Sequence, residues 1–150
     1  MNRKDRTIHT GWLIDGSGRP ARRDALIKLS GGLISSVTGY TAGSSEYLDF
    51  TDCTIIPALC DSHTHLAISG ELDPEIRDNQ LQYGYDQAEP MITDHARDYL
   101  RHGVLTVRDG GDFNAHALRY KNEHQNKKDL YLSIYAAGNG IHVKGRYGQL

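Results

Sequence analysis

After Ile55, strand-like segments alternate with segments whose apolar residues recur at helical spacing, and this alternation constrains the fold more than any other feature of the sequence. The strand-like segments lie at 55–65, 105–107 and 130–137, and the helical ones at 91–104 and 113–124. Strands that alternate with helices usually form a parallel sheet with right-handed crossovers. We therefore predict an α/β fold for residues 57–150, with a long loop between the first strand and the first helix.

Residues 1–56 carry signals for β-structure only. Segments at 7–14, 25–29, 33–37, 47–50 and 54–56 are rich in β-branched and aromatic residues, and most are separated by glycine-containing turns. The pair Gly31-Gly32 is a two-residue connection typical of a hairpin. Short strands of this kind usually belong to a small sheet or sandwich. We therefore predict two domains, a small β-sandwich-like layer at 1–56 and an α/β part at 57–150.

The composition argues against two classes of partner. The chain has 150 residues and a formal net charge of −2, and its longest apolar run, Ile55–Cys60, is far shorter than the ~20 residues a membrane span needs. The charged start leads into no apolar core of a secretory signal. Residues 31–98 hold twelve acidic side chains against two basic ones, whereas nucleic-acid binders need a continuous cationic face. We expect a cytoplasmic protein that binds neither membranes nor nucleic acids.

The pair His63 and His65 directly follows the apolar run and is the strongest candidate for chemistry. On a strand both side chains would point to the same face, because side chains alternate with period two. Their Cβ atoms would lie roughly 6–7 Å apart, so both imidazoles could reach one divalent cation at about 2.0–2.1 Å. A bare His-x-His pair is usually chance surface chemistry. Here it ends a strand at the mouth of a predicted parallel sheet, where ligand sites form, so we predict that both histidines bind a metal.

Three motifs carry a resemblance to a known family. Residues 57–65, Pro-Ala-Leu-Cys-Asp-Ser-His-Thr-His, resemble the P-G-L-I-D-x-H-x-H signature of the amidohydrolase superfamily, with Ala58 and Cys60 as departures that a packed strand can absorb. Residues 103–111 are similar to the G-x-T-T-V-R-D-x-G-G segment of the branch with imidazolonepropionase-like and prolidase-like enzymes. Residues 138–148 resemble the loop after the third barrel strand in that branch, and 13–16 fit its small β-sandwich.

The resemblance implies a (β/α)₈ TIM barrel preceded by a small β-sandwich layer. Such a barrel needs roughly 250 residues, so this chain would supply the first three β/α units of an incomplete barrel. We expect it to be the N-terminal piece of an amidohydrolase, either a truncated gene product or a partial sequence. In the family, a lysine, two further histidines and an aspartate from later strands complete the metal site. Unpaired barrel edges would also favour self-association.

The activity implied by the resemblance is hydrolysis of a carbon–nitrogen bond by metal-activated water. The cofactor would be a divalent metal, with zinc expected, as one or two ions in a complete enzyme. The substrate would be a small-molecule amide or dipeptide, such as an Xaa-Pro dipeptide, an N-acyl amino acid or a cyclic amide. The alternative is a catalytically inactive truncated remnant with at most weak metal binding. No catalytic residue is assigned, and we expect the 150-residue chain alone to be a poor catalyst.

Other polar residues are weighed individually. His142 lies in a glycine-rich loop after a predicted strand, where barrel enzymes keep substrate-contacting groups; we predict that it binds substrate, with a mobile polar loop as an equal alternative. Asp61 is expected to support the ligands first and to bind metal second. For Arg108 and Asp109 we expect an internal ion pair that ties the strand to a loop, with contact to the substrate as the alternative. Four histidines on predicted helices are explained by solvent exposure: His95, His102, His116 and His124. Both cysteines, Cys53 and Cys60, are expected to be buried small apolar residues without a disulfide.

Overall fold

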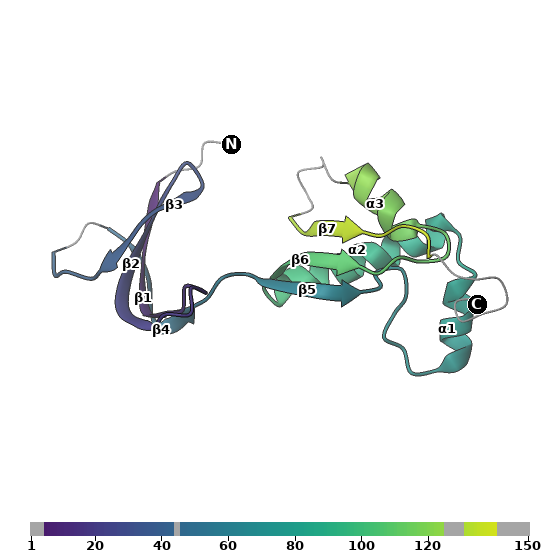
Figure 1. Cartoon of the computed structure of the whole chain (residues 1–150), viewed down its shortest axis with the longest axis horizontal. Coiled ribbons are helices and arrows are strands. Elements are labelled where there is room, and N and C mark those ends of the chain that lie inside the picture. The colour runs from purple at the N-terminus through teal and green to yellow at the C-terminus, as the bar shows by residue number, and fades with distance from the viewer. Residues whose placement is uncertain (1–4, 44–45, 125–130, 141–150) are drawn as a thin grey trace. The chain divides into compact units, whose positions relative to one another are not determined.

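The computed structural model describes residues 5–43, 46–124 and 131–140 (Figure 1). The chain divides into two compact units, Met1–Pro57 and Ala58–Leu150. The first consists of strands, and the second alternates strands with helices.

The first unit contains one four-stranded sheet. Its strands are β1 (Arg6–Leu13), β2 (Arg22–Ser30), β3 (Leu33–Gly39) and β4 (Leu48–Ile55), in the order β3-β2-β1-β4 (Figure 1). β2 pairs antiparallel with β1 and β3, and β4 runs parallel to β1. The predicted hairpin at Gly31-Gly32 is confirmed, and both glycines have the positive φ that such a turn requires. The described residues form no second sheet in this unit, so the sandwich stays a prediction.

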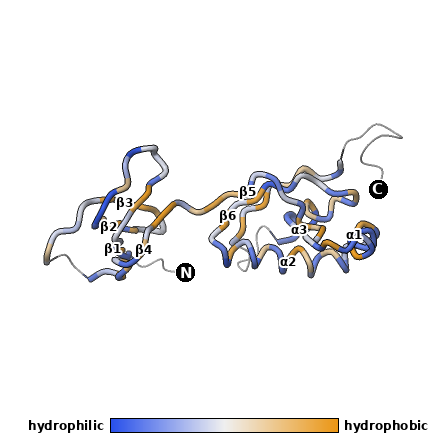
Figure 2. Tube along the Cα trace, turned by 90° about the horizontal axis from the view of Figure 1, so that it is seen from below, coloured by the Kyte–Doolittle hydropathy of each residue, from blue (hydrophilic) through white to orange (hydrophobic). Residues whose placement is uncertain are grey.

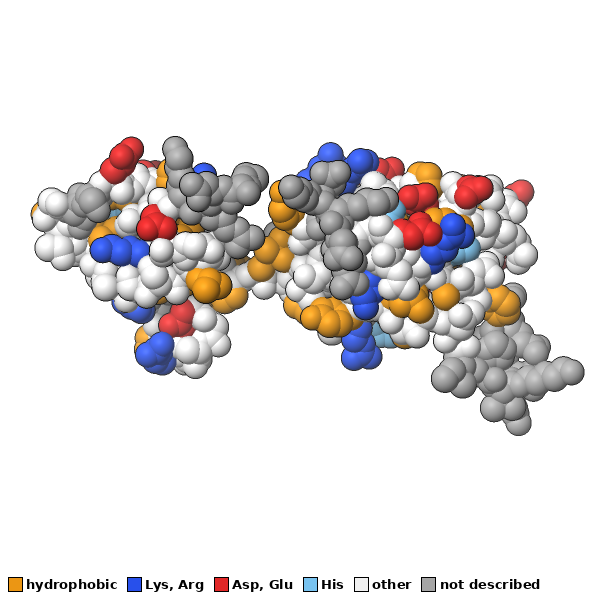
Figure 3. Space-filling view, turned by 90° about the horizontal axis from the view of Figure 1, so that it is seen from above, with side chains coloured by type: hydrophobic (Ala, Val, Ile, Leu, Met, Phe, Trp, Pro, Cys, Tyr) orange, Lys and Arg blue, Asp and Glu red, His pale blue; other side chains and the backbone are white. Residues whose placement is uncertain are grey.

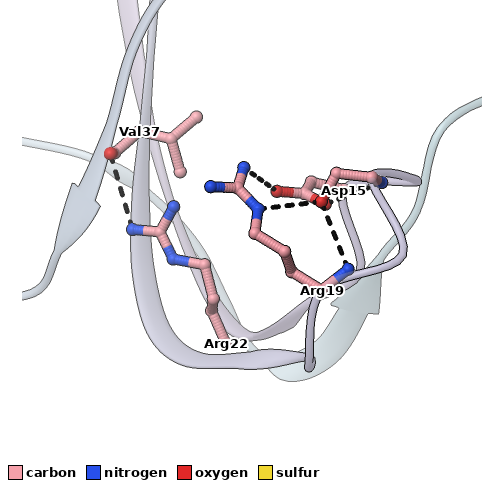
Figure 4. A network of polar contacts seen from close by, with 5 residues as sticks. Asp15, Arg19, Arg22 and Val37 are labelled. Atoms are coloured by element: carbon pink, nitrogen blue, oxygen red, sulfur yellow. Dashed lines mark hydrogen bonds and ion pairs between the residues drawn. The ribbon is translucent and has the colours of Figure 1, made fainter.

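Polar contacts hold the turn between β1 and β2 (Figure 4). The carboxylate of Asp15 accepts hydrogen bonds from the Ser17 backbone N–H at 3.0 Å and from Arg19 Nη2 at 3.2 Å. The hydrogen bonds from Ser17 hold the pKa of Asp15 below its ordinary value. Arg22 at the start of β2 donates to the carbonyl of Val37 on β3, at 3.5 Å. The turn predicted from its glycines is therefore also fixed by an acidic side chain.

The second unit contains a three-stranded parallel sheet with helices. Its elements are β5 (Leu59–Thr64), α1 (Pro74–Leu81), α2 (Tyr85–Arg101), β6 (Val104–Asp109), α3 (His116–His124) and β7 (Ser133–Ala136). The sheet order is β5-β6-β7 and all strands are parallel, as predicted (Figure 1). The sheet does not close into a barrel among the described residues.

The core of the second unit lies between this sheet and helices α2 and α3. Val107 and Ile134, which are register partners on β6 and β7, are buried together with Ile92 of α2 and Tyr120 of α3. Polar and apolar residues alternate along α2 (Figure 2), so the helix buries one stripe and exposes the other. This packing fixes the sheet end where the candidate ligands lie.

Helix α1 lies in the segment for which the sequence pattern predicts a long loop. No residue of α1 is buried, so the helix has no apolar stripe by which periodicity could reveal it. Its start signal lies in the sequence instead: Asp73 caps the helix by accepting the Glu75 backbone N–H at 2.9 Å, and Pro74 occupies the first turn. The cap, not the hydrophobic pattern, was the available signal.

The expectation that both cysteines are buried is wrong. Cys53 and Cys60 are free and exposed. They lie on β4 and β5, which are edge strands of their sheets among the described residues, so few neighbours cover their side chains.

Large hydrophobic side chains remain on the surface of both units (Figure 3). The most exposed are Leu33 in the first unit and Leu72 and Tyr131 in the second. Among the helices that the structure describes, none has the length and apolar character to cross a membrane. Self-association through unpaired edges stays a prediction.

Candidate metal centre

His63 and His65 bring their side chains together at the C-terminal end of β5. Their ring centroids are 5.4 Å apart, with the ring planes at 68°. A Cβ atom built on Gly110, just after β6, would lie 3.4 Å from the Nε2 atom of each ring. The two Nε2 atoms therefore face the same small space beside Gly110, which only a glycine leaves open.

The hydrogen bond of His65 determines which of its nitrogens is free. Its Nδ1 lies 2.9 Å from the carbonyl oxygen of Gly111. A carbonyl can only accept, so Nδ1 carries the proton and Nε2 keeps its lone pair. A neutral imidazole that donates through one nitrogen and offers the other is the usual form of a metal-ligating histidine. This arrangement fits a divalent cation that prefers nitrogen ligands, such as zinc.

Asp61 supports the end of β5, as the sequence predicted for its first role. Its Oδ1 accepts the His63 backbone N–H at 3.0 Å, and its Oδ2 accepts the Tyr99 hydroxyl at 2.9 Å. Both bonds hold the pKa of Asp61 below its ordinary value, and the bond from the His63 N–H has the larger effect. The Tyr99 hydroxyl also bonds to Thr64 Oγ1 at 2.7 Å, so α2 is tied to the strand that carries the histidines.

Replacing Tyr99 by phenylalanine should lower the free energy of unfolding by about 1–3 kcal/mol, because a half-buried hydroxyl that bonds to a carboxylate is lost. Urea unfolding measures the change. The matched control is Tyr135→Phe, since that side chain is exposed and the same atom is removed. Equal losses in the two variants would contradict a specific role of the Tyr99 hydroxyl.

Among the described residues, neither Arg108 nor Asp109 forms the expected ion pair. Adjacent strand residues point to opposite faces, so Arg108 is exposed while Asp109 is 1% exposed. The Asp109 carboxylate instead accepts backbone N–H groups from Leu66 and Gly111, each at 2.8 Å.

Solvent exposure does not explain all four helical histidines. His116 is buried, and its Nε2 bonds to the Tyr83 carbonyl, because this face of α3 packs on the core. His95 is half-buried and bonds through Nδ1 to the Leu66 carbonyl. His142, predicted to bind substrate, lies outside the described residues.

A second group of possible ligands was missed by the sequence analysis. The ligand atoms of Glu89, Glu123 and His124 lie within 4.8 Å of one another. Glu89 is on α2 and the other two are on α3, so only the packing of the helices reveals the group. Its members already have protein partners: His124 bonds to Glu89 at 2.9 Å, and Glu123 accepts from Arg119 at 2.8 Å.

An open cavity of about 1320 Å³ begins at His65 and Gly110. Its lining is mostly apolar and includes Leu66 and Phe113, while Arg77 of α1 contributes a cationic group and Glu71, Asp98 and Asp112 contribute acidic ones. A small molecule with an apolar part could therefore lie next to His65.

Comparisons with known proteins find matches in structure alone. No protein-family model matches the chain, and no curated protein sequence matches it. A solved Xaa-Pro dipeptidase with bound methionine in the active site is 25% identical, with a TM-score of 0.70 over 92% of this chain and 34% of that one. A solved amidohydrolase is 20% identical, with a TM-score of 0.67 over 91% and 32% of the two chains. Phenylurea hydrolase B is 19% identical, with a TM-score of 0.71 over 92% and 31%.

The matches cover very different shares of this chain and of the solved proteins. They cover about nine-tenths of this chain, which spans only about a third of the length of the solved proteins. The chain thus matches the amidohydrolase superfamily in structure, in the way that an N-terminal portion of such a protein would.

Proposed function

We propose that the chain is the N-terminal part of a metal-dependent hydrolase that cleaves carbon–nitrogen bonds. One observation carries the proposal: the Nε2 atoms of His63 and His65 converge beside Gly110 at the carboxyl end of a parallel sheet. Ligand sites of α/β proteins form at this end of the strands. The likeness to a solved Xaa-Pro dipeptidase supports the reaction class.

The proposed architecture is an incomplete (β/α)₈ barrel. In it, β5, β6 and β7 are the first three barrel strands, residues 57–150 form the first three β/α units, and residues 1–56 belong to a small β-sandwich layer. The parallel order and the helices between the strands support this assignment.

His63 and His65 would hold the divalent cation, for which zinc is the first candidate. A cation at this place would polarise the scissile carbonyl and make water more acidic. The chain itself contributes orientation: Gly111 holds the His65 ring through Nδ1, and Gly110 leaves the space that both Nε2 atoms face. His142 stays a proposed substrate contact.

The proposed substrate is a small amide or dipeptide that lies in the cavity next to His65. The mostly apolar lining suits the side chain or ring of such a molecule, and Arg77 suits a carboxylate. The relative solved with bound methionine supports a ligand of amino-acid size.

The alternative is a catalytically inactive truncated remnant with at most weak metal binding. The observation that favours it is that two histidine nitrogens fill only half of a tetrahedral zinc shell. Assays of the purified chain with zinc, against Xaa-Pro dipeptides, N-acyl amino acids and cyclic amides, separate the two. Turnover that is lost in the His63→Ala variant supports the hydrolase, whereas zinc binding without turnover supports the alternative for this chain. Absence of zinc binding contradicts the proposed metal centre and agrees with the inactive remnant.

A further inference from the structure

Asp109 is the most deeply buried carboxylate among the described residues, and the proposed chemistry does not use it. The residue is 1% exposed at the end of β6. Its Oδ2 accepts the Leu66 backbone N–H, and its Oδ1 accepts the Gly111 backbone N–H, each at 2.8 Å. No cationic side chain among the described residues pairs with it, so backbone donors alone satisfy a buried charge. Both oxygens of the carboxylate are thus hydrogen-bonded, as buried polar groups must be, and each bond fixes a backbone N–H in place.

Both backbone groups held by Asp109 belong to the surroundings of His65. Leu66 is the next residue after His65, so one bond fixes the main chain that carries the imidazole. Gly111 supplies the carbonyl that accepts from His65 Nδ1 at 2.9 Å, so the other bond fixes the group that orients the ring. One carboxylate therefore fixes both the main chain next to His65 and the carbonyl that orients the His65 ring.

The surrounding backbone leaves little room for Gly111 to take another position. Gly111 has φ +96, and a Cβ on it would lie 2.5 Å from the Gly138 carbonyl oxygen. The Asp112 backbone N–H donates to that same carbonyl at 3.0 Å. The Gly111 carbonyl is thus held in one direction, toward His65.

We propose that Asp109 is a positioning residue that keeps His65 in the Nδ1–H tautomer, so that its Nε2 lone pair faces the space shared with His63. The role toward a cation rests on the proposed function. The tautomer does not, because it is a property of the metal-free chain. If Asp109 had a purely structural role, its replacement would lower stability without changing which nitrogen of His65 carries the proton.

The test is the tautomer of His65 in the metal-free chain. Long-range ¹H–¹⁵N spectra of the neutral imidazole, recorded at about pH 8.5, distinguish Nδ1–H from Nε2–H. The His65→Ala variant assigns the signal among the eight histidines. We expect Nδ1–H in the wild type and a shift toward Nε2–H, the form preferred in water, in Asp109→Asn. Zinc affinity should fall about 10–100-fold in the same variant.

Two control variants separate positioning from folding. Asp61→Asn makes the same chemical change at the end of β5, where the carboxylate contacts His63 and Tyr99 but not the His65 ring. Ile92→Ala removes a fully buried side chain from the core and lowers stability without changing the segments that contain His65 and Gly111. Both should keep His65 as Nδ1–H. A shift in Ile92→Ala equal to that in Asp109→Asn would overturn the proposal.

Each result decides a distinct question. An Nε2–H tautomer in the wild type overturns the proposal, as does an unchanged tautomer in a folded Asp109→Asn chain. If Asp109→Asn does not fold, Asp109→Ser replaces it. If neither variant folds, the tautomer of His65 in the wild type is the remaining test of the proposal. A tautomer shift without any zinc binding supports the positioning role and contradicts the proposed function. Zinc binding through His63 and His65 without a change of tautomer in the variant supports the proposed function and contradicts the positioning role.

Discussion

Zinc binding by the chain should disappear when His63 and His65 are both replaced by alanine. The two Nε2 atoms face one space, so the double substitution removes both candidate nitrogen ligands beside Gly110. The wild type should bind zinc weakly and lose it readily to a chelator, because two ligands make only half of a four-coordinate shell. Titration calorimetry of wild type and double variant at equal concentration measures the difference.

A second candidate location makes a control necessary. Glu89, Glu123 and His124 lie close enough to hold a cation between α2 and α3. The His124→Ala variant should keep the wild-type heat of zinc binding, because the partners of these side chains are already supplied by the protein. Loss of binding in His124→Ala together with retention in the double variant would place the cation between the helices and contradict the proposed centre.

The parallel sheet was predictable because its signals are local. The segments that became β5, β6 and β7 are apolar or β-branched, and helical stripes separate them, so sequence order alone implies parallel pairing. α1 escaped the same reasoning because none of its residues is buried. A helix whose start is stabilised by its cap, here Asp73 and Pro74, leaves no trace in hydrophobic periodicity.

The candidate centre was predictable only in part. The spacing of His63 and His65 indicated a pair of ligands, but the groups that orient them come from distant segments. Tyr99 reaches Asp61 from α2, and Gly111 reaches His65 from the loop after β6. Such contacts depend on how α2 and β6 pack against β5, which no local pattern encodes. For the same reason, the hydrogen bonds that Asp109 accepts from Leu66 and Gly111 were not predictable.

Replacing Gly110 by alanine should weaken zinc binding about 10–100-fold, because the new methyl group would occupy the space beside the two imidazoles. Its Cβ would lie 2.9 Å from His65 Cε1, closer than real Cβ contacts allow, and 3.4 Å from both Nε2 atoms. The His65 ring must then move away from its partner. Gly110 does not have a positive φ, so the variant tests the space and not backbone strain. Gly111→Ala could not make this distinction, because its φ is +96.

The matched control for Gly110→Ala is Gly70→Ala. No heavy atom lies within 4 Å of a Cβ built on Gly70, so this variant should bind zinc as the wild type does. The stability loss of Gly110→Ala should stay within about 1–3 kcal/mol, the usual cost of an added methyl in a packed place, and urea unfolding measures it. A folded Gly110→Ala chain with wild-type zinc affinity would mean that the cation is not held where the two Nε2 atoms converge. If zinc binding is weakened in Gly110→Ala but not in Gly70→Ala, the metal lies beside Gly110, because only the methyl group at Gly110 would contact an imidazole.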